Sequence, residues 1–163
     1  MYKDYIIEVP NFPIKGVNFK DISPLLSDHR TFRSAVADMG RLVKNPDYWV
    51  GIDARGFIFA SALSMVYGGG VVMCRKKGKL PPPVQSYGYT KEYGVDRLEI
   101  KEGSGNVVIV DDVLASGGTL QVVNNLVENA GYTVKDNLVL LDLKYVPTIV
   151  DFTLDVKSLV QYE

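Results

Sequence analysis

Four short runs of apolar residues constrain the fold more than any other feature of this sequence. The runs cover residues 49–53, 70–74, 106–110 and 137–142, and Gly, Asp or Asn residues bound them. Apolar runs of this length, without alternating polar residues, are typical of strands that are buried on both faces of a parallel sheet.

The segments between these runs have the spacing of helices. Residues 30–44 place apolar side chains three or four positions apart, and Asp28 is a candidate N-cap before them. Residues 56–67 are apolar and rich in small side chains, and residues 119–130 end at Gly131, a candidate C′ residue. Strands that alternate with helices indicate an α/β fold, in which right-handed crossovers connect parallel strands.

Residues 75–94 follow neither the helical nor the strand period. The segment is first basic, then rich in Pro, and finally rich in Tyr and Gly. An irregular segment of this length inside a compact domain is usually a functional loop or lid, or is disordered. We therefore predict a flexible loop over residues 75–94.

Composition narrows the class of protein. A chain of 163 residues is long enough for one hydrophobic core, so we expect a single domain over residues 1–163. With 18 Lys and Arg against 19 Asp and Glu, the net charge of −1 excludes a generally basic nucleic-acid binder. One Cys forms no intramolecular disulfide, and neither a membrane span nor a secretory signal is evident. We expect a cytoplasmic protein without membrane or nucleic-acid partners.

The residues with the clearest chemistry follow the third apolar run. Asp111 and Asp112 come directly after it, and the small-residue stretch Ala115, Ser116, Gly117, Gly118 and Thr119 then opens a predicted helix. Backbone N–H groups, two hydroxyls and a helix N-terminus together form a cradle for a phosphate monoester. The two carboxylates repel that phosphate, and they suit ribose hydroxyls, bound directly or through a hydrated divalent cation.

This arrangement predicts a site for ribose 5-phosphate. An isolated Asp-Asp or Gly-Gly pair would more often be a turn and a cap, but the complete run favours the binding site. The run has neither the spacing of a Walker A loop nor that of a dinucleotide-binding fingerprint.

The run at residues 107–119 resembles the phosphoribosyl pyrophosphate motif of type I phosphoribosyltransferases. Other segments resemble the adenine phosphoribosyltransferase branch: residues 12–26 its base-site segment, 51–57 its pyrophosphate loop, and 75–81 with 92–94 and 98–100 its flexible catalytic loop. The resemblance covers residues 12–143. It implies the type I fold, a mostly parallel twisted sheet flanked by helices, with a small N-terminal hood (1–26) and a flexible catalytic loop (75–94).

The resemblance also assigns basic residues to the pyrophosphate. It implies that Arg55, a catalytic residue, shares the pyrophosphate oxygens through its guanidinium, and Asp53 is a candidate to orient that group. Arg75, Lys76 and Lys79 supply further positive charge for this leaving group. A basic run is otherwise most often a solvated surface.

In the flexible loop, the resemblance makes Glu92 the second catalytic residue and Tyr93 a residue that closes over the site. Glu92 would handle a proton at the imidazole nitrogens of the purine once the loop closes. Closure would exclude water from an oxocarbenium-like sugar. The alternative for Glu92 is a solvated side chain.

The base site implied by the resemblance comprises Val17, Asn18 and Lys20. Related proteins bind adenine largely through backbone groups of this segment. Asn18 stands where an aliphatic residue is common, so its amide is a candidate reader of a different purine edge.

The activity that the resemblance implies is transfer of phosphoribose from phosphoribosyl pyrophosphate to adenine, giving AMP and pyrophosphate in purine salvage. Mg²⁺ is the implied cofactor, held mainly through the substrate, with Asp111 and Asp112 as candidate ligands through water. A homodimer is expected. Two alternatives stay open: a transferase for another base such as hypoxanthine or guanine, and a non-catalytic regulator that senses phosphoribosyl pyrophosphate.

Overall fold

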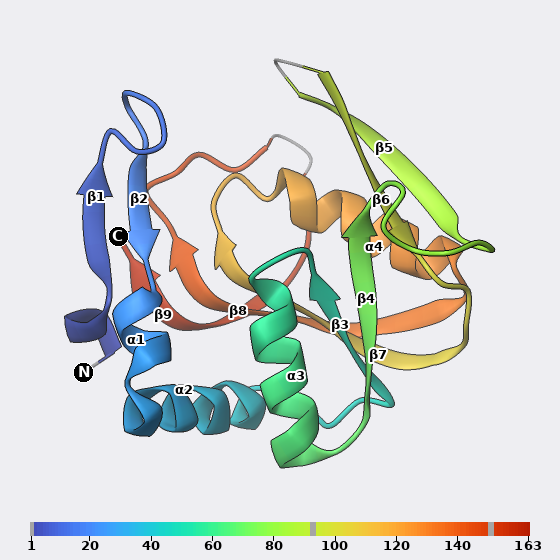
Figure 1. Ribbon diagram of the computed structural model, residues 1–163, viewed down its shortest axis with the longest axis horizontal. Coiled ribbons are helices and arrows are strands. Elements are labelled where there is room, and N and C mark those ends of the chain that lie inside the picture. The colour runs from blue at the N-terminus through green and yellow to red at the C-terminus, as the bar shows by residue number, and fades with distance from the viewer. Residues whose placement is uncertain (1, 92–93, 150–151) are drawn as a thin grey trace.

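A seven-stranded sheet forms the centre of the protein (Figure 1). The computed structural model describes residues 2–91, 94–149 and 152–163. The strand order is β5-β6-β4-β3-β7-β8-β9; the five strands from β4 to β9 run parallel to one another, and β6 is antiparallel to β4. These strands are β3 (Tyr48–Ile52), β4 (Gly70–Lys76), β7 (Gly105–Leu114), β8 (Tyr132–Leu143) and β9 (Val156–Tyr162). The predicted mostly parallel α/β sheet is confirmed.

Helices cover both faces of this sheet. On one face lie α2 (His29–Arg41), which follows the short α1 (Ser23–Ser27), and α3 (Gly56–Tyr67), whereas α4 (Gly118–Asn129) covers the other. The carboxylate of Asp28 accepts a hydrogen bond from the backbone N–H of Thr31 at 2.8 Å and so caps α2. Gly131 follows α4 with a φ of 106°, a conformation that favours glycine. Both predicted helix ends are confirmed.

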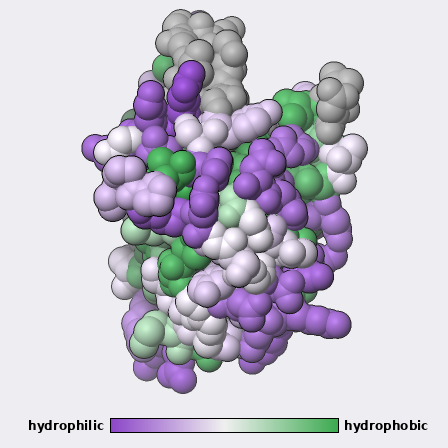
Figure 2. Space-filling model, turned by 90° about the vertical axis from the view of Figure 1, so that its right-hand side faces the viewer, coloured by the Kyte–Doolittle hydropathy of each residue, from purple (hydrophilic) through white to green (hydrophobic). Residues whose placement is uncertain are grey.

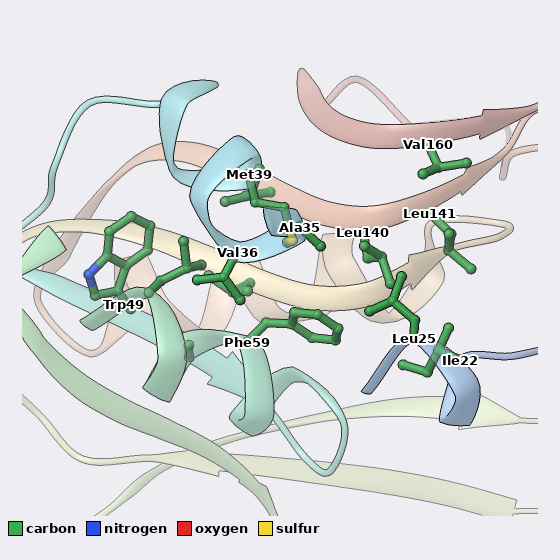
Figure 3. Close-up of a cluster of buried hydrophobic side chains, with 14 of the residues drawn as sticks. Ile22, Leu25, Ala35, Val36, Met39, Trp49, Phe59, Leu140, Leu141 and Val160 are labelled. Atoms are coloured by element: carbon green, nitrogen blue, oxygen red, sulfur yellow. The ribbon is translucent and has the colours of Figure 1, made fainter. Parts of the chain in front are cut away.

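Alternating residues of β7 divide the hydrophobic core into two clusters. Val108 and Val110 face α2 and α3, where they pack in a cluster with Trp49 and Phe59 (Figure 3). Val107 and Ile109 face the other cluster, under α4. All four β7 side chains are fully buried. Burial on both faces explains the continuous apolar run in the sequence.

The N-terminal residues form a separate two-stranded antiparallel sheet beside β9 (Figure 1). The 3₁₀ helix η1 (Tyr2–Tyr5) leads into β1 (Ile7–Pro10), which pairs with β2 (Asn18–Asp21). This sheet corresponds in position to the predicted hood segment.

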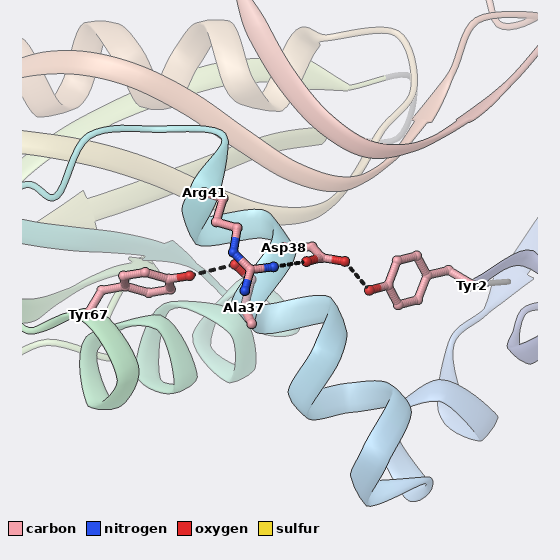
Figure 4. A network of polar contacts seen from close by, with 5 residues as sticks. All are labelled: Tyr2, Ala37, Asp38, Arg41 and Tyr67. Atoms are coloured by element: carbon pink, nitrogen blue, oxygen red, sulfur yellow. Dashed lines mark hydrogen bonds and ion pairs between the residues drawn. The ribbon is translucent and has the colours of Figure 1, made fainter.

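A polar network ties η1 to the helices (Figure 4). The hydroxyl of Tyr2 donates to Asp38 on α2 at 2.5 Å, and Asp38 also pairs with Arg41. Burial and the hydrogen bond to Asp38 raise the pKa of Tyr2 to about 12, so the phenol remains a donor at neutral pH. Tyr67 on α3 donates to the carbonyl of Ala37 at 2.5 Å and links the two helices.

The prediction of an irregular segment over residues 75–94 is wrong for much of its length. Strand β4 extends to Lys76, and β5 (Gln85–Lys91) pairs antiparallel with β6 (Gly94–Ile100) to form a hairpin. The side of the molecule with this hairpin and α4 is mainly hydrophilic, with hydrophobic residues in small separate patches (Figure 2). A strand pair at the sheet edge needs no apolar run, and its Tyr, Gly and Ser residues therefore concealed it.

None of the helices in the described part of the chain is long and apolar enough to span a membrane.

Candidate active site

A cavity of about 410 Å³ lies at the carboxyl ends of the central strands. The chain crosses from β3 to β4 through α3 on one face and from β7 to β8 through α4 on the other face. Strand order therefore reverses between β3 and β7, and such a switch point leaves a crevice where ligands bind in open α/β sheets. The cavity is lined by Ile52, Asp53, Ala54, Arg55, Lys76, Leu98, Asp111, Asp112, Val113, Leu114, Ala115, Ser116, Gly117, Gly118, Thr119, Leu120 and Val139.

The two neighbouring carboxylates lie inside β7, which continues to Leu114 instead of ending before them. Asp112 is only 4% exposed, and one of its carboxylate oxygens is 2.8 Å from Nε of Arg55. Asp111 accepts a hydrogen bond from the backbone N–H of Asp112 at 2.9 Å. Gly56 permits this close arrangement, because a Cβ there would lie 2.6 Å from the carbonyl oxygen of Val110.

Burial sets the protonation behaviour of this pair. It raises the pKa of Asp111, and the charge of Asp112 raises it further. Burial also raises the pKa of Asp112, although the Arg55 guanidinium opposes the shift. Two crowded carboxylates with raised pKa values favour any ligand that brings hydrogen-bond donors or positive charge to them.

Two arginines flank the cavity, each with its own carboxylate. The guanidinium of Arg55 is 5.0 Å from the ring centroid of Phe19 in β2, in addition to its ion pair with Asp112. Nε of Arg75 is 3.5 Å from a carboxylate oxygen of Asp53, and its guanidinium lies 5.7 Å from the ring centroid of Phe57.

The expectation that Asp53 orients Arg55 is therefore wrong. The backbone N–H of Asp53 donates to the carbonyl of Cys74 at 2.9 Å, which directs Asp53 toward the end of β4. The backbone N–H of Lys76 in turn donates to the Asp53 carboxylate at 3.4 Å. Asp53 thus joins the end of β4 to the loop before α3, where the Asp53–Ala54 peptide bond is cis.

The small-residue loop between β7 and α4 forms the opposite wall. Gly117 has a φ of 88°, and a Cβ there would lie 2.5 Å from the ring of Phe152, so the position requires glycine. The backbone N–H of Ile149 donates to the carbonyl of Ser116 at 2.9 Å and fixes the loop from outside. Ala115 and Ser116 are exposed at the cavity, and α4 begins at Gly118, so its first N–H groups point there.

Comparison with known proteins places the chain in a family. Residues 33–141 match the model of the phosphoribosyl transferase domain. An adenine phosphoribosyltransferase of Bdellovibrio bacteriovorus is 42% identical over 98% of both chains. The chain belongs to the adenine phosphoribosyltransferase family.

Solved structures of adenine phosphoribosyltransferases have the same architecture. The enzyme from Thermoanaerobacter pseudethanolicus has a TM-score of 0.88 and 38% identity, with 99% of this chain and 98% of that chain covered. The enzyme from Giardia lamblia, solved in complex with 9-deazaadenine, also has a TM-score of 0.88, at 28% identity over 99% of this chain and 96% of that one. The expected type I fold is confirmed.

The cavity brings together most of the residues that the sequence assigned to the adenine phosphoribosyltransferase site. The residues concerned are Arg55, Lys76, Asp111, Asp112, Ala115, Ser116, Gly117, Gly118 and Thr119. Arg75 adjoins the cavity through Asp53, whereas Lys79 is exposed and outside the lining; its carbonyl accepts from Arg75 at 3.4 Å. Glu92 and Tyr93 lie outside the described residues.

The base-site residues show an arrangement that the sequence did not indicate. Val17 immediately precedes β2, and Asn18 and Lys20 lie within it. Successive side chains of a strand point to opposite faces, so Phe19 meets Arg55 while Asn18 and Lys20 point to the other side. Phe19 thus contacts Arg55, a residue of the cavity lining, from β2. The two-residue period of a strand predicts that Phe19 lies on the face opposite to Asn18 and Lys20. It does not predict which of the two faces is turned toward Arg55.

The carboxylates of Asp111 and Asp112 are suited to a Mg²⁺ ion whose other ligands come mainly from the bound substrate and water. Within the described residues, no group of three or more His, Cys, Asp and Glu side chains is arranged to hold a metal. Asp111 and Asp112 provide the oxygen ligands that Mg²⁺ prefers, and Arg55 occupies one oxygen of Asp112. The two carboxylates therefore fit an ion bound through water and substrate oxygens.

Proposed function

We propose that this protein transfers the 5-phosphoribosyl group from phosphoribosyl pyrophosphate to adenine, giving AMP and pyrophosphate. The observation that carries the proposal is the switch-point cavity, where the half-buried Asp111 and the buried Asp112 lie between the small-residue loop and Arg55. Membership of the adenine phosphoribosyltransferase family supports adenine as the base.

The loop at residues 115–119 binds the 5-phosphate of the substrate. Its backbone N–H groups, the hydroxyls of Ser116 and Thr119, and the N-terminus of α4 all favour an anion. Because Gly117 fixes the loop conformation, the donors are in place before the phosphate arrives, and little ordering is needed on binding.

The pyrophosphate lies on the opposite side, near Arg55, Arg75 and Lys76. These cations stabilise the negative charge that develops as pyrophosphate leaves. Asp112 holds Arg55 through Nε, which leaves the terminal nitrogens of the guanidinium as donors for the leaving group. Lys79, outside the cavity lining, reaches pyrophosphate only if its turn moves toward the site.

Asp111 and Asp112 hold the ribose between these two ends by accepting its hydroxyl protons. Asp111 and Asp112 would hold Mg²⁺ through water, and the ion would supply positive charge that stabilises the leaving pyrophosphate. The negative carboxylates below the ring also favour the positive charge that develops on the sugar in an oxocarbenium-like transition state.

The adenine ring lies near Phe19, with backbone groups of Val17 to Lys20 as its hydrogen-bonding partners. Glu92 is the proposed group for proton handling at the purine nitrogens, and Tyr93 closes over the site. Closure of the β5–β6 hairpin over the cavity would exclude water during transfer.

We also propose a cytoplasmic homodimer. Helix α3 contains no charged residue, yet Met65 is 86% and Val66 57% exposed on it. A helix that is apolar all round is normally covered, and a second copy would cover this one. Light scattering of the wild type and of Met65→Glu tests the dimer, because a charge at this position should yield monomers.

A single buried Cys, without a disulfide framework, supports the cytoplasmic location.

A double substitution of the two carboxylates tests the site. Asp111→Asn with Asp112→Asn keeps the side-chain volume but replaces two acceptors for ribose hydroxyls with amides. Loss of two charge-assisted hydrogen bonds, at about 1.5–3 kcal/mol each, lowers kcat/KM for phosphoribosyl pyrophosphate by about two to four orders of magnitude. A folded double variant with near wild-type activity would remove both residues from the site.

Two alternatives make different predictions in the same assay. A transferase for another purine would release pyrophosphate with hypoxanthine or guanine instead of adenine. A sensor would bind phosphoribosyl pyrophosphate without releasing pyrophosphate with any base.

A further inference from the structure

Lys20 occupies an enclosed position between the N-terminal sheet and the main sheet. Its side chain is only 3% exposed, although lysine is rarely buried. Its ammonium pairs with Glu8 at 2.8 Å, directly across the β1–β2 ladder. The same ammonium is 4.1 Å from the ring centroid of Tyr162 and 5.6 Å from that of Tyr145.

These partners belong to different parts of the fold. Glu8 lies in the N-terminal sheet with Lys20, whereas Tyr162 lies in the edge strand β9 of the seven-stranded sheet. Tyr145 lies just after β8, and the neighbouring backbone N–H of Lys144 donates to the Tyr162 carbonyl at 2.8 Å. Lys20 is therefore a cation on one sheet that is enclosed by aromatic rings fixed on the other.

The other face of β2 is directed to the active site. Phe19 contacts the guanidinium of Arg55, which is itself paired with Asp112. A single strand thus presents Phe19 to Arg55, which lines the cavity, and Lys20 to the aromatic residues behind it. Displacement of Lys20 from its position would move Phe19 and the adjacent backbone as well.

We infer that Lys20 is a positioning residue for the base site: its ammonium, held by Tyr162, Tyr145 and Glu8, fixes β2 against β9 at the distance that adenine binding requires. The inference rests on the proposed adenine transfer. According to this inference, the side chain of Lys20 does not contact the substrate. Tyr162, which follows all the residues of the cavity lining in the sequence, then contributes to adenine affinity through Lys20.

The chemistry of the contacts supports this role. An ammonium on a desolvated aromatic face is attracted by the ring quadrupole more strongly than at an exposed site. Glu8 is 52% exposed, so it can be solvated when Lys20 is replaced, and the substitution leaves no buried unpaired charge on Glu8. The amide Nδ2 of Asn18 donates to the other carboxylate oxygen of Glu8 at 2.8 Å, so Glu8 keeps one partner when Lys20 is replaced.

The test combines kinetics with amide hydrogen exchange. Lys20→Met keeps an unbranched side chain only one atom shorter but removes the cation, and Tyr162→Leu removes the ring. Each should raise KM for adenine about tenfold and leave KM for phosphoribosyl pyrophosphate within about twofold, because the phosphate loop is not moved. Each should also accelerate exchange of the amides in residues 17–21, while the amides of β7 are unchanged.

Matched variants separate positioning from other roles. Lys20→Arg keeps a cation on the ring and Tyr162→Phe keeps the ring, so both should stay near the wild-type KM for adenine. Lys15→Met removes an exposed lysine of the same hairpin and serves as the control. The double variant Lys20→Met with Tyr162→Leu should be less impaired than the sum of the two single variants, because either substitution alone already removes the contact between the ammonium and the Tyr162 ring.

Three outcomes would overturn the inference. One is a rise in KM for phosphoribosyl pyrophosphate in Lys20→Met with a silent Tyr162→Leu, which would show direct substrate contact. The second is full additivity in the double variant, and the third is unchanged exchange in residues 17–21. The exchange measurement needs no turnover, so it tests the contact even if the wild type fails to use adenine, a result that would reject the proposed function instead.

Discussion

Replacement of Asp111 by Asn should make the protein more stable while it impairs catalysis. The Asp111 carboxylate lies beside that of Asp112, and burial and the neighbouring charge both raise its pKa. The ionised form is therefore unfavourable in the folded state. Asn retains an oxygen that can accept the hydrogen bond from the backbone N–H of Asp112, so the substitution removes the charge and keeps the contact.

The magnitude follows from the charges around this position. Adjacent like charges repel by about 1–4 kcal/mol at the effective dielectric of a protein, and Arg55 offsets part of that repulsion. We expect the free energy of unfolding to rise by about 1–2 kcal/mol at pH 7.5, in the range found when active-site strain is relieved. For a chain of this size, that corresponds to a Tm higher by about 3–6 °C.

The pH dependence has a definite sign. Because the folded-state pKa of Asp111 lies above the unfolded value of about 3.9, the folded protein binds more protons between these two pKa values. The wild type therefore loses stability as pH rises through the folded-state pKa. Asp111→Asn escapes this loss, so its advantage in Tm should be smallest at the acid end of the range and should grow as the pH rises.

Thermal unfolding followed by circular dichroism from pH 4.5 to 8, together with kcat/KM, measures both effects. Asp155→Asn is the control, because Asp155 lies at the surface, where its carboxylate pairs with Lys157; its Tm should stay within about 1 °C of the wild type. A lower Tm for Asp111→Asn at pH 7.5, or a Tm difference that does not change with pH, would refute the reasoning.

Three further predictions address other parts of the site. Arg55→Lys cannot hold Asp112 and pyrophosphate together with one ammonium, so steady-state kinetics should show kcat reduced by about tenfold or more. Gly117→Ala places a methyl group against Phe152, and calorimetry should show a loss of about 1–3 kcal/mol together with a higher KM for phosphoribosyl pyrophosphate. Limited proteolysis should cut residues 77–94 in the free protein, and phosphoribosyl pyrophosphate with Mg²⁺ should suppress the cut; equal cleavage with and without ligand would reject a closing hairpin.

The parallel core was predictable because burial on both faces leaves a direct mark on the sequence. Residues 107–110 are continuously apolar, and they lie in a strand buried on both faces, with helices on both sides. Asp28 and Gly131 marked helix ends through local hydrogen bonding and backbone conformation, which depend on few other residues. The small-residue loop between β7 and α4 was also visible in the sequence, since its glycines and hydroxyl residues are contiguous in the chain; its role in phosphate binding stays a prediction.

Features that depend on contacts between distant residues were missed. The β5–β6 hairpin lies at a sheet edge, where a strand needs few apolar residues. The partner of Asp53 depends on the position of β4, which places Arg75 and not Arg55 beside it. The enclosure of Lys20 requires Tyr162, which is 142 positions away in sequence and adjacent only through the packing of two sheets.

The base preference tests the central claim most directly. Adenine presents a donor at its exocyclic amine and an acceptor at N1, whereas hypoxanthine reverses both. The backbone of residues 17–20 offers a fixed donor and acceptor pattern, and the amide of Asn18 donates to Glu8 on the face of β2 opposite to Phe19. The measurement is pyrophosphate release with adenine, hypoxanthine and guanine in parallel, each with Mg²⁺ and phosphoribosyl pyrophosphate. We predict AMP formation from adenine, with the other two bases at least about a hundredfold poorer in kcat/KM; equal or better use of hypoxanthine would contradict the account.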